Sequence, residues 1–342
     1  MFNPHTWRAL AALVLTVLAT ATGTASAAPA FGFNEDWHAR AGLAAHSAAL
    51  GAEVNRQGLY WGEIERAPGQ YDWARFDRVH AEFRDAGVRP LFVALGSPCW
   101  ARPSTPCTND PRFTPPDPRF NQAYARFAAA AAQRYPDMAA IELWNEPNFD
   151  TFWTTGPDPA GYSRLACSAY RAVKSAAPGL TVIAPALAPR RRSSAHIMGQ
   201  ASFLKGAMRA GLGACFDDLS VHLYPEPRNL FPSLRRQLDE IRRTAAAAEP
   251  RRRARRIWVT EAGIPGARAG DSQQAQLLRS AFMELRAQPG IRAMLAHRFK
   301  DAPASAPAAG PADPRYGLLD ATGAPKAGTL ALLRDLGVLP RS

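Results

Sequence analysis

The sequence is poor in cysteine, in acidic charge and in long apolar runs. Its 342 residues include 4 cysteines, with no Cys-x-x-Cys pair or clustered histidine beside them, so a zinc site is poorly supported. Beyond the N-terminal region no stretch is apolar enough to cross a bilayer, and we expect no stable membrane insertion. No Gly-rich phosphate loop follows the first predicted strand, Phe31–Asn34, which disfavours a dinucleotide-binding open sheet. No repeat at solenoid spacing is visible.

The N-terminal region has the pattern of a secretory signal peptide. Arg8 provides a basic start, residues 9–19 are apolar and uncharged, and Ala25-Ser26-Ala27 fits a small-residue cleavage site. An uncleaved membrane anchor is the alternative, but the strongly apolar part is too short to span a bilayer. We therefore expect a signal peptide over residues 1–27, a mature domain over residues 28–342, and a protein that is secreted or held in the cell envelope.

Export permits disulfide bonds, and the four cysteines allow three pairings. Cys99 and Cys107 bracket one Pro-rich loop and can close it, which leaves Cys167 for Cys215. The alternative is four free thiols, which is the less common state outside the cell.

Basic residues outnumber acidic ones. The chain has 41 Lys and Arg against 29 Asp and Glu, a formal net charge of +12 that comes mostly from arginine. This balance is compatible with a nucleic acid, an anionic surface or an acidic substrate as partner, and also with simple solubility. Because export argues against a nuclear or ribosomal role, we expect no nucleic-acid partner.

Apolar, strand-like runs alternate with helix-like runs along almost the whole mature chain. Such alternation predicts a parallel sheet covered by helices, and eight units in about 310 residues suit an α/β fold of the (β/α)8 TIM-barrel type in a single domain. A doubly wound open sheet is the runner-up. The predicted strands are Phe31–Asn34, Glu53–Gln57, Pro90–Leu95, Ala140–Trp144, Thr181–Ala184, Leu219–Leu223, Ile257–Thr260 and Ala293–Phe299. The predicted helices are Trp73–Ala86, Asn121–Arg134, Ala160–Ala176, Phe203–Ala210, Leu234–Ala248 and Ser272–Ala287.

In two of the predicted strands, a glutamate follows within two residues of the strand end. One lies in Leu143-Trp144-Asn145-Glu146-Pro147-Asn148 and the other in Ile257-Trp258-Val259-Thr260-Glu261-Ala262-Gly263. Glutamate is rarely buried unless it is paired, and the strand ends of a (β/α)8 barrel are where its chemistry is found. Two carboxylates aimed at one cavity can break a glycosidic bond, since one protonates the leaving oxygen and the other meets the anomeric carbon. The alternative is a structural ion-pair network across the barrel.

Further motifs accompany these glutamates in order along the chain. They are Arg56 with Trp61-Gly62-Glu63-Ile64-Glu65 and Gly69-Gln70-Tyr71-Asp72-Trp73, then His222-Leu223-Tyr224, and finally Tyr316-Gly317-Leu318-Leu319 with Pro325-Lys326. Together the set resembles the clan A glycoside hydrolases, a retaining (β/α)8 group, and is nearest to the small family 39 and family 5 relatives. The resemblance covers essentially all of residues 31–336.

The resemblance implies a role for each matching residue. Glu146 is the expected general acid and later base, and Glu261 the expected nucleophile. Arg56 is expected to lie beside Glu261 and keep it ionised, and Tyr224 to donate a hydrogen bond to the same carboxylate. Asn145 is expected to hold the sugar 2-hydroxyl. His222 is expected to bind a substrate hydroxyl.

The aromatic residues of the substrate site are less well defined by the sequence. Trp100 and Trp153 lie in predicted loops at the barrel mouth and are candidate sugar platforms. Relatives carry a tryptophan at the end of the eighth strand, under the reacting sugar, where this chain reads His297-Arg298-Phe299-Lys300 and only Phe299 offers a substitute. Many family 5 relatives also place a histidine after the third strand, where this chain has Ser97-Pro98-Cys99.

These observations predict an exported retaining glycoside hydrolase that cleaves a β-linked oligo- or polysaccharide by double displacement. We expect a monomer that needs no metal or organic cofactor. The run Arg190–Arg192 follows the fifth predicted strand near the cleft, so an anionic substrate is one option, whereas the arginines of residues 251–256 fall on the opposite face. The alternatives are a catalytically silent barrel that only binds carbohydrate and a basic scaffold protein of the cell envelope.

Overall fold

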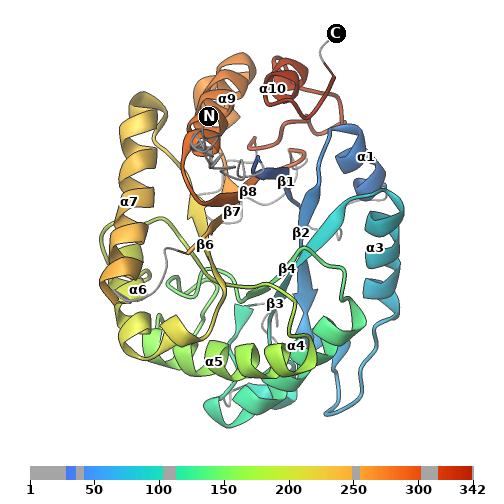
Figure 1. Ribbon diagram of the computed structural model, residues 1–342, viewed down its shortest axis with the longest axis vertical. Coiled ribbons are helices and arrows are strands. Elements are labelled where there is room, and N and C mark those ends of the chain that lie inside the picture. Colours follow the sequence, from blue (N-terminus) through green and yellow to red (C-terminus); the bar gives the residue numbers. More distant parts are fainter. Residues whose placement is uncertain (1–27, 36–41, 103–112, 249–254, 302–314, 341–342) are drawn as a thin grey trace, which may run out of the picture.

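The computed structural model describes residues 28–35, 42–102, 113–248, 255–301 and 315–340. Eight parallel strands form a closed barrel in chain order, and β1 pairs with β8 to complete it (Figure 1). The predicted TIM barrel is thereby confirmed. The strands are β1 (Ala30–Asn34), β2 (Val54–Tyr60), β3 (Arg89–Leu95), β4 (Ala140–Leu143), β5 (Val182–Leu187), β6 (Asp218–Leu223), β7 (Ile257–Ala262) and β8 (Ile291–Ala296).

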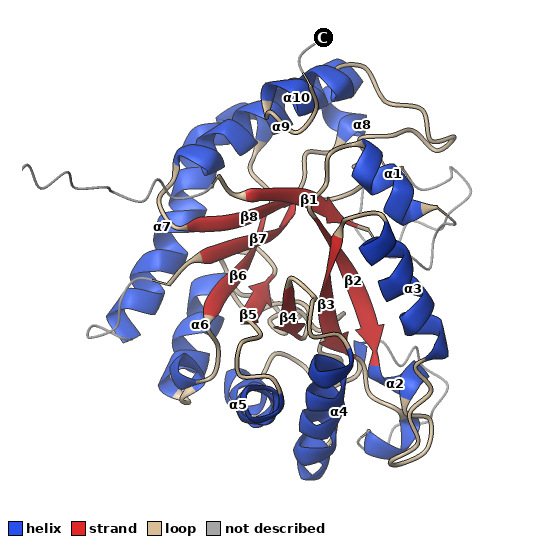
Figure 2. Ribbon diagram, turned by 45° about the vertical axis from the view of Figure 1, so that its right-hand side comes forward, coloured by secondary structure: helices blue, strands red, loops and turns tan. Residues whose placement is uncertain are grey.

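Helices surround the strands on the outside of the barrel (Figure 2). They are α1 (Leu43–Ala49), α2 (Trp61–Ile64), α3 (Ala74–Asp85), α4 (Asn121–Arg134), α5 (Pro159–Ala176), α6 (Gln200–Arg209), α7 (Leu230–Ala248), α8 (Gly266–Ala269), α9 (Asp271–Ala287) and α10 (Thr329–Asp335). The sequence pattern predicts neither α1 nor α10, because each has only 7 residues and is too short to show a clear periodicity.

Helix α5 shows how local sequence sets a helix start. The side chain of Asp158 caps the helix by accepting a hydrogen bond from the Ala160 N–H at 3.0 Å. Pro159 follows at the first helical position, where its missing N–H costs nothing. The loop after β4 therefore ends at Asp158, where the cap fixes the start of α5.

The strands are buried on both faces, as expected for a parallel sheet covered by helices. Every residue of β5, β6 and β7 is buried, and of these strands β5 alone is apolar throughout. Polar side chains on such strands are exceptions that need a partner. Among them are Arg56, Glu142, His222 and Glu261, and all four belong to one cluster.

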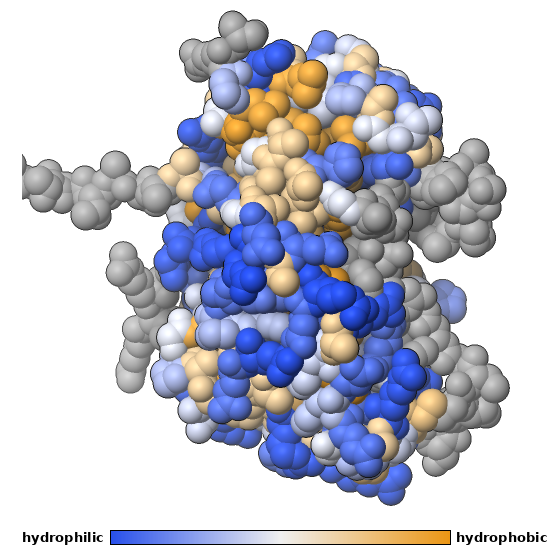
Figure 3. All heavy atoms as spheres, turned by 90° about the vertical axis from the view of Figure 1, so that its right-hand side faces the viewer, coloured by the Kyte–Doolittle hydropathy of each residue, from blue (hydrophilic) through white to orange (hydrophobic). Residues whose placement is uncertain are grey.

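The surface of the described residues exposes few large apolar side chains, namely Phe231, Met283 and Leu330. The face at the right of Figure 1, which carries α1 and α3, is largely hydrophilic, with one hydrophobic area in its upper part (Figure 3). Within the described segments, no helix combines the length and apolar character that a membrane crossing requires.

One of the predicted disulfide bonds lies wholly within the described residues. Cys167 of α5 is bonded to Cys215, which directly precedes the segment leading into β6, with their Cα atoms 4.7 Å apart. Cys99 is also disulfide-bonded, and Cys107, its predicted partner, lies outside the described residues.

We expect the Cys167–Cys215 bond to stabilise the fold, because it closes a segment of 48 residues. A loop-entropy model gives roughly 4 kcal/mol as an upper value. Replacing both cysteines by serine should therefore lower the free energy of unfolding by about 2–4 kcal/mol. Urea denaturation with and without reductant is the measurement, and reductant should affect the double variant less than the wild type. An unchanged midpoint in the double variant would contradict this expectation.

Candidate active site

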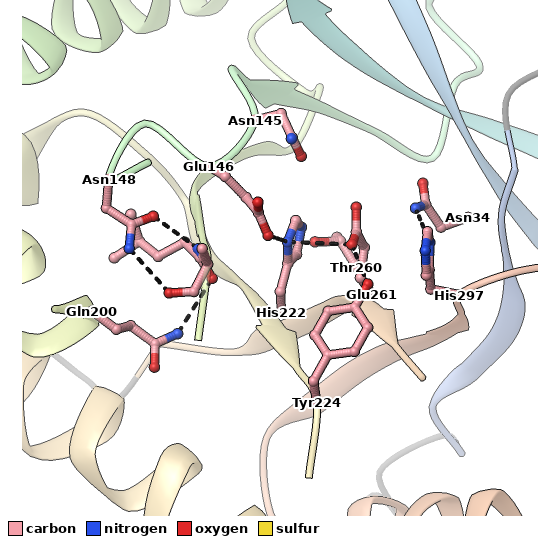
Figure 4. Close-up of polar contacts among 12 residues, drawn as sticks. Asn34, Asn145, Glu146, Asn148, Gln200, His222, Tyr224, Thr260, Glu261 and His297 are labelled. Carbon is pink, nitrogen blue, oxygen red and sulfur yellow. Dashed lines mark hydrogen bonds and ion pairs between the residues drawn. The ribbon is translucent and has the colours of Figure 1, made fainter. Parts of the chain in front are cut away.

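The carboxyl ends of β4, β6 and β7 bring three predicted site residues together. Glu146 follows β4, His222 lies in β6 and Glu261 lies in β7, and their side chains converge in Figure 4. One carboxylate oxygen of Glu146, one of Glu261 and a ring nitrogen of His222 lie within 4.8 Å of one another. Retaining glycosidases hold their carboxyl groups about 5–5.5 Å apart, whereas inverting ones need about 6.5–9.5 Å to admit a water. The short separation fits the retaining arrangement.

His222 lies between the two carboxylates. Its Nδ1 is 2.7 Å from Glu146 Oε1 and 3.5 Å from Glu261 Oε2. Burial favours the neutral ring, but the charges of Glu261 and Glu146 outweigh it and raise the pKa of His222 above its usual value. Its Nε2 is also buried and has no partner among the described residues. In the structure the contacts of His222 are therefore with the two carboxylates, and its contact with a substrate hydroxyl stays a prediction.

Glu261 is held in its ionised form. Its Oε1 accepts a hydrogen bond from Arg56 Nη1 at 2.9 Å, and its Oε2 accepts one from the Tyr224 hydroxyl at 2.6 Å. Burial alone would favour the neutral carboxyl, but the charges of His222 and Arg56 and the hydrogen bond from Tyr224 lower the pKa of Glu261 to about 2. A carboxylate that is ionised at neutral pH is suited to be a nucleophile.

Arg56 of β2 joins the groups around Glu261. Its Nε donates to Glu142 Oε2 at 2.6 Å, its Nη1 donates to Asn34 Oδ1 at 3.0 Å, and its Nη2 donates to Asn145 Oδ1 at 2.8 Å. Burial opposes the charge, but Glu142 and Glu261 outweigh it and raise the pKa of Arg56. The amide nitrogen of Asn145 has no partner among the described residues. It is therefore available to donate to a sugar hydroxyl.

The backbone after β4 is strained where it carries Glu146. Trp144 has φ 72° and Glu146 has φ 40°, both in the left-handed region that side-chain-bearing residues rarely adopt. Such residues cost on the order of 1–3 kcal/mol each and persist only where surrounding contacts fix them. Here Trp144 Nε1 donates to Phe152 O at 2.7 Å, and Glu146 N donates to Ala186 O at 2.8 Å. The position of Glu146 is thus set by its own loop and by β5.

Asn148 ties the loop after β4 to the loop after β5, and this contact is visible in Figure 4. Its fully buried side chain accepts from Ala188 N at 2.8 Å and donates to Ala188 O at 3.0 Å and to Met198 O at 2.9 Å. Asp150 N continues the connection by donating to His196 O at 2.9 Å. The two loops form one hydrogen-bonded unit beside Glu146.

The three predicted aromatic platforms are all at least partly buried. Phe299 is only 2 % exposed and packs edge-on against Phe33, so it belongs to the core and offers no free face to a sugar. Trp100 is partly buried, where its Nε1 donates to Glu65 O at 2.9 Å. Trp153 is 5 % exposed and lines a separate cavity of about 200 Å³ together with prolines and polar residues.

His297 occupies the strand end where the sequence analysis considers Phe299. The predicted strand Ala293–Phe299 is too long, because β8 ends at Ala296 and His297 follows it directly. The His297 ring lies 5.8 Å from that of Tyr224 and 5.5 Å from that of Tyr316, and its Nδ1 is 3.0 Å from Asn34 Nδ2. Burial lowers the pKa of His297 to about 4, so the ring is neutral at neutral pH. The signal in the sequence is the position of the strand end, because a strand that ends at Ala296 makes His297 the next residue at the carboxyl end of the barrel.

Within the described segments, one trio of side chains has metal-binding donor atoms close enough together to hold an ion. It consists of Glu146, His222 and Glu261. Contacts within this trio and with Tyr224 already engage Nδ1 of His222, Oε1 of Glu146 and Oε2 of Glu261. The chemistry of two carboxylates described below requires no metal.

Comparison with solved structures gives the fold relatives of this barrel. A family 39 glycoside hydrolase from the gut symbiont Bacteroides cellulosilyticus WH2 superposes with a TM-score of 0.68 at 20 % identity, over 90 % of this chain and 64 % of that one. A family 39 β-xylosidase from Caulobacter crescentus gives 0.66 at 20 % identity, over 89 % and 70 % of the two chains. Xylanase 10B from Thermotoga maritima gives 0.64 at 16 % identity, over 90 % and 95 %.

These relatives share the (β/α)8 fold with this chain, as the resemblance to clan A glycoside hydrolases implies. The chain spans less than two thirds of the length of the Bacteroides enzyme. No protein-family model matches the sequence, and a search of curated proteins returned no match.

The low pKa of Glu261 predicts a pH-dependent contribution to stability. Because the folded pKa of about 2 lies below the usual value of 4.5, the contribution is present above pH 4.5 and is lost as the pH falls toward 2. It amounts to roughly 3 kcal/mol. Urea denaturation between pH 7 and 3 should show a steeper loss for the wild type than for Glu261→Gln. Glu63→Gln, which removes a partly exposed ion pair with Arg75, is the control and should follow the wild type. Parallel curves for wild type and Glu261→Gln would contradict the assignment.

Proposed function

We propose that the protein is a retaining glycoside hydrolase that cleaves a β-linked oligo- or polysaccharide by double displacement. The observation that carries this proposal is the placement of Glu146 and Glu261 oxygens within 4.8 Å at the carboxyl end of the barrel. The fold relatives support it, since they include a β-xylosidase, a xylanase and an exo-β-1,4-mannosidase.

In the first step Glu146 donates its proton to the glycosidic oxygen while Glu261 attacks the anomeric carbon. The bond between that carbon and the glycosidic oxygen breaks, the leaving sugar departs with the proton, and an ester joins the glycosyl group to Glu261. In the second step Glu146, now ionised, takes a proton from water, and the water oxygen displaces Glu261 from the anomeric carbon. Two inversions give net retention.

The neighbours of the two glutamates divide the remaining tasks. Arg56 and Tyr224 hold Glu261 ionised and aimed, and the free amide nitrogen of Asn145 is placed to donate to the sugar 2-hydroxyl. His297 and Tyr316 lie around the Tyr224 ring and give this end of the site a polar aromatic wall. A hydrogen bond to the 2-hydroxyl that strengthens in the transition state contributes several kcal/mol to such reactions.

We also propose that the protein is exported and that residues 1–27, which lie outside the described residues, are a signal peptide. The apolar segment of residues 9–19 and the Cys167–Cys215 disulfide support this location, because structural disulfides are typical of oxidising compartments.

The roles of the two glutamates can be separated with azide. Glu261→Gly lacks the nucleophile, so azide entering the vacated space should restore part of the activity and give the inverted glycosyl azide. Glu146→Ala should still form the covalent intermediate from an aryl glycoside whose leaving group needs no proton, and azide should then give the retained product. Nuclear magnetic resonance of the products reports the stereochemistry.

A retained azide product from Glu261→Gly and an inverted one from Glu146→Ala would mean that the roles of acid and nucleophile are exchanged. Full activity of both variants would place the chemistry elsewhere. A wild type that releases no reducing sugar from any β-glycan of a broad panel would contradict the proposed hydrolysis and favour a barrel that only binds carbohydrate or a basic scaffold protein of the cell envelope.

The loop after β5 supports an anionic substrate. Arg190, Arg191 and Arg192 are exposed and have no counter-ion among the described residues. The loop that carries them is fixed, because Gln200 N donates to Arg190 O at 2.6 Å and the backbone of Arg191 lies so close to Gly199 that a Cβ there would be 2.7 Å from its carbonyl oxygen. Arg190 is two residues beyond Ala188, so their Cα atoms are at most about 7 Å apart. The backbone that carries the three arginines thus starts beside the unit that holds Glu146.

Neutralising these arginines should weaken binding of an acidic polymer selectively. Arg190, Arg191 and Arg192 changed together to Gln should raise KM about tenfold for a glycan bearing carboxylates, and leave KM for its carboxyl-reduced form unchanged. Glucuronoxylan and carboxyl-reduced glucuronoxylan are a suitable pair. The matched control changes three exposed arginines elsewhere, Arg89, Arg243 and Arg292, to Gln. Equal effects of the two triple variants would mean that only net charge matters.

A further inference from the structure

A third carboxylate, Glu142, lies below the paired glutamates inside the barrel. It belongs to β4 and is fully buried, where a glutamate without a cationic partner is strongly disfavoured. Its Oε2 lies 2.6 Å from both Nε and Nη2 of Arg56, and its Oε1 accepts a hydrogen bond from the Thr260 hydroxyl at 3.1 Å. Both carboxylate oxygens are therefore engaged, and neither partner is a solvent-exposed group.

These contacts reach Glu261 along two routes. Thr260 directly precedes Glu261 in β7, so a hydrogen bond to Glu142 fixes the backbone from which Glu261 projects. Arg56 holds Glu142 with one edge of its guanidinium and donates from Nη1 to Glu261 Oε1 at 2.9 Å. Glu142 thus links β2, β4 and β7 at the level just beneath the reacting groups.

The charge of Arg56 is shared between Glu142 and Glu261. A guanidinium prefers to bind one carboxylate with two parallel N–H bonds when no other anion competes. Without the charge of Glu142, Arg56 would turn its fork fully onto Glu261. That turn would draw the Glu261 carboxylate away from the anomeric carbon and remove Nη2 from Asn145. A carboxylate held by a second charged N–H is also a poorer nucleophile.

We propose that Glu142 is a positioning residue for attack by Glu261. It fixes the direction of the Arg56 guanidinium, so that Glu261 receives one hydrogen bond from Arg56 and keeps its orientation toward the anomeric carbon. This inference rests on the function proposed above and adds a residue that touches neither the substrate nor the reacting atoms.

A buried ion pair can also serve the barrel alone, and Asp218 provides the comparison. It is the first residue of β6, at the opposite end of the barrel from the site, and is 4 % exposed. It accepts a hydrogen bond from Trp258 Nε1 at 3.1 Å and pairs with Arg256 at 3.4 Å. Asp218→Asn is therefore a matched control for the loss of one buried carboxylate charge from a barrel strand.

The experiment measures attack by Glu261 in isolation. The probe is 2,4-dinitrophenyl 2-deoxy-2-fluoro-β-D-xyloside, or the glucose or mannose analogue, whichever labels the wild type. Its leaving group needs no proton, so its inactivation rate reports formation of the glycosyl ester and mass spectrometry locates that ester on Glu261. Glu142→Gln should lower the limiting rate constant about tenfold or more and change the inhibition constant by less than about threefold. Asp218→Asn should change neither value.

A second pair of variants keeps the test valid where Glu142→Gln folds poorly. Thr260→Val removes the hydrogen bond to Glu142 without changing any charge, and should slow inactivation in the same sense but less. Thr260→Ser keeps the hydroxyl and should restore the wild-type rate. Circular dichroism and melting temperature establish that each variant is folded.

Two results would overturn the proposal. One is a folded Glu142→Gln with the wild-type inactivation rate, and the other is an equal loss of rate in Asp218→Asn. Failure of the proposed function gives a different result, because then no probe labels Glu261 in the wild type and no glycan is cleaved. In that case the positioning role of Glu142 is rejected as well.

Discussion

The arrangement of this barrel depends on one buried guanidinium. Removing an ion from water costs several kcal/mol even after relaxation, so Arg56 can lie inside the barrel only if carboxylates and amide oxygens surround it. Its five N–H bonds reach Asn34, Glu142, Asn145 and Glu261, which come from β1, β4, the loop after β4 and β7. The same bonds that satisfy Arg56 hold Glu261 ionised. The burial of Arg56 and the ionised state of Glu261 therefore have one physical origin.

The sequence predicts the fold because the strands of a covered parallel barrel carry an unmistakable pattern. The segment that becomes β5, for example, is buried on both faces and appears as a short apolar run between longer helical segments. Helix α4 has the predicted bounds, since its apolar positions follow the helical period over 14 residues. The helices α1 and α10 escape prediction because 7 residues show no clear periodicity, and the end of β8 is predicted three residues too late.

The sequence predicts the positions of residues that match a motif near the carboxyl end of a strand, as for Glu146, Glu261 and Tyr224, and it predicts Arg56 by its motif alone, since this residue lies within β2. The site is not predictable where function depends on contacts between remote residues. Glu142 sits inside an apolar run that reads as ordinary strand, and its partner Arg56 is 86 residues away. His222 matches its motif, yet its 2.7 Å contact with Glu146 is not part of what the motif predicts. Aromatic residues mislead because packing in the core and stacking on sugars favour the same side chains.

The hydrogen bonds of Asn148 also determine where this fold can accept new sequence. They fasten both ends of the loop after β5, at Ala188 and Met198, and Asp150 holds His196, which leaves Ser193, Ser194 and Ala195 exposed between these contacts. Residues inserted there lie outside the contacts that fix Glu146. This short stretch is therefore a natural insertion point, at which the loop can change while Glu146 keeps its position.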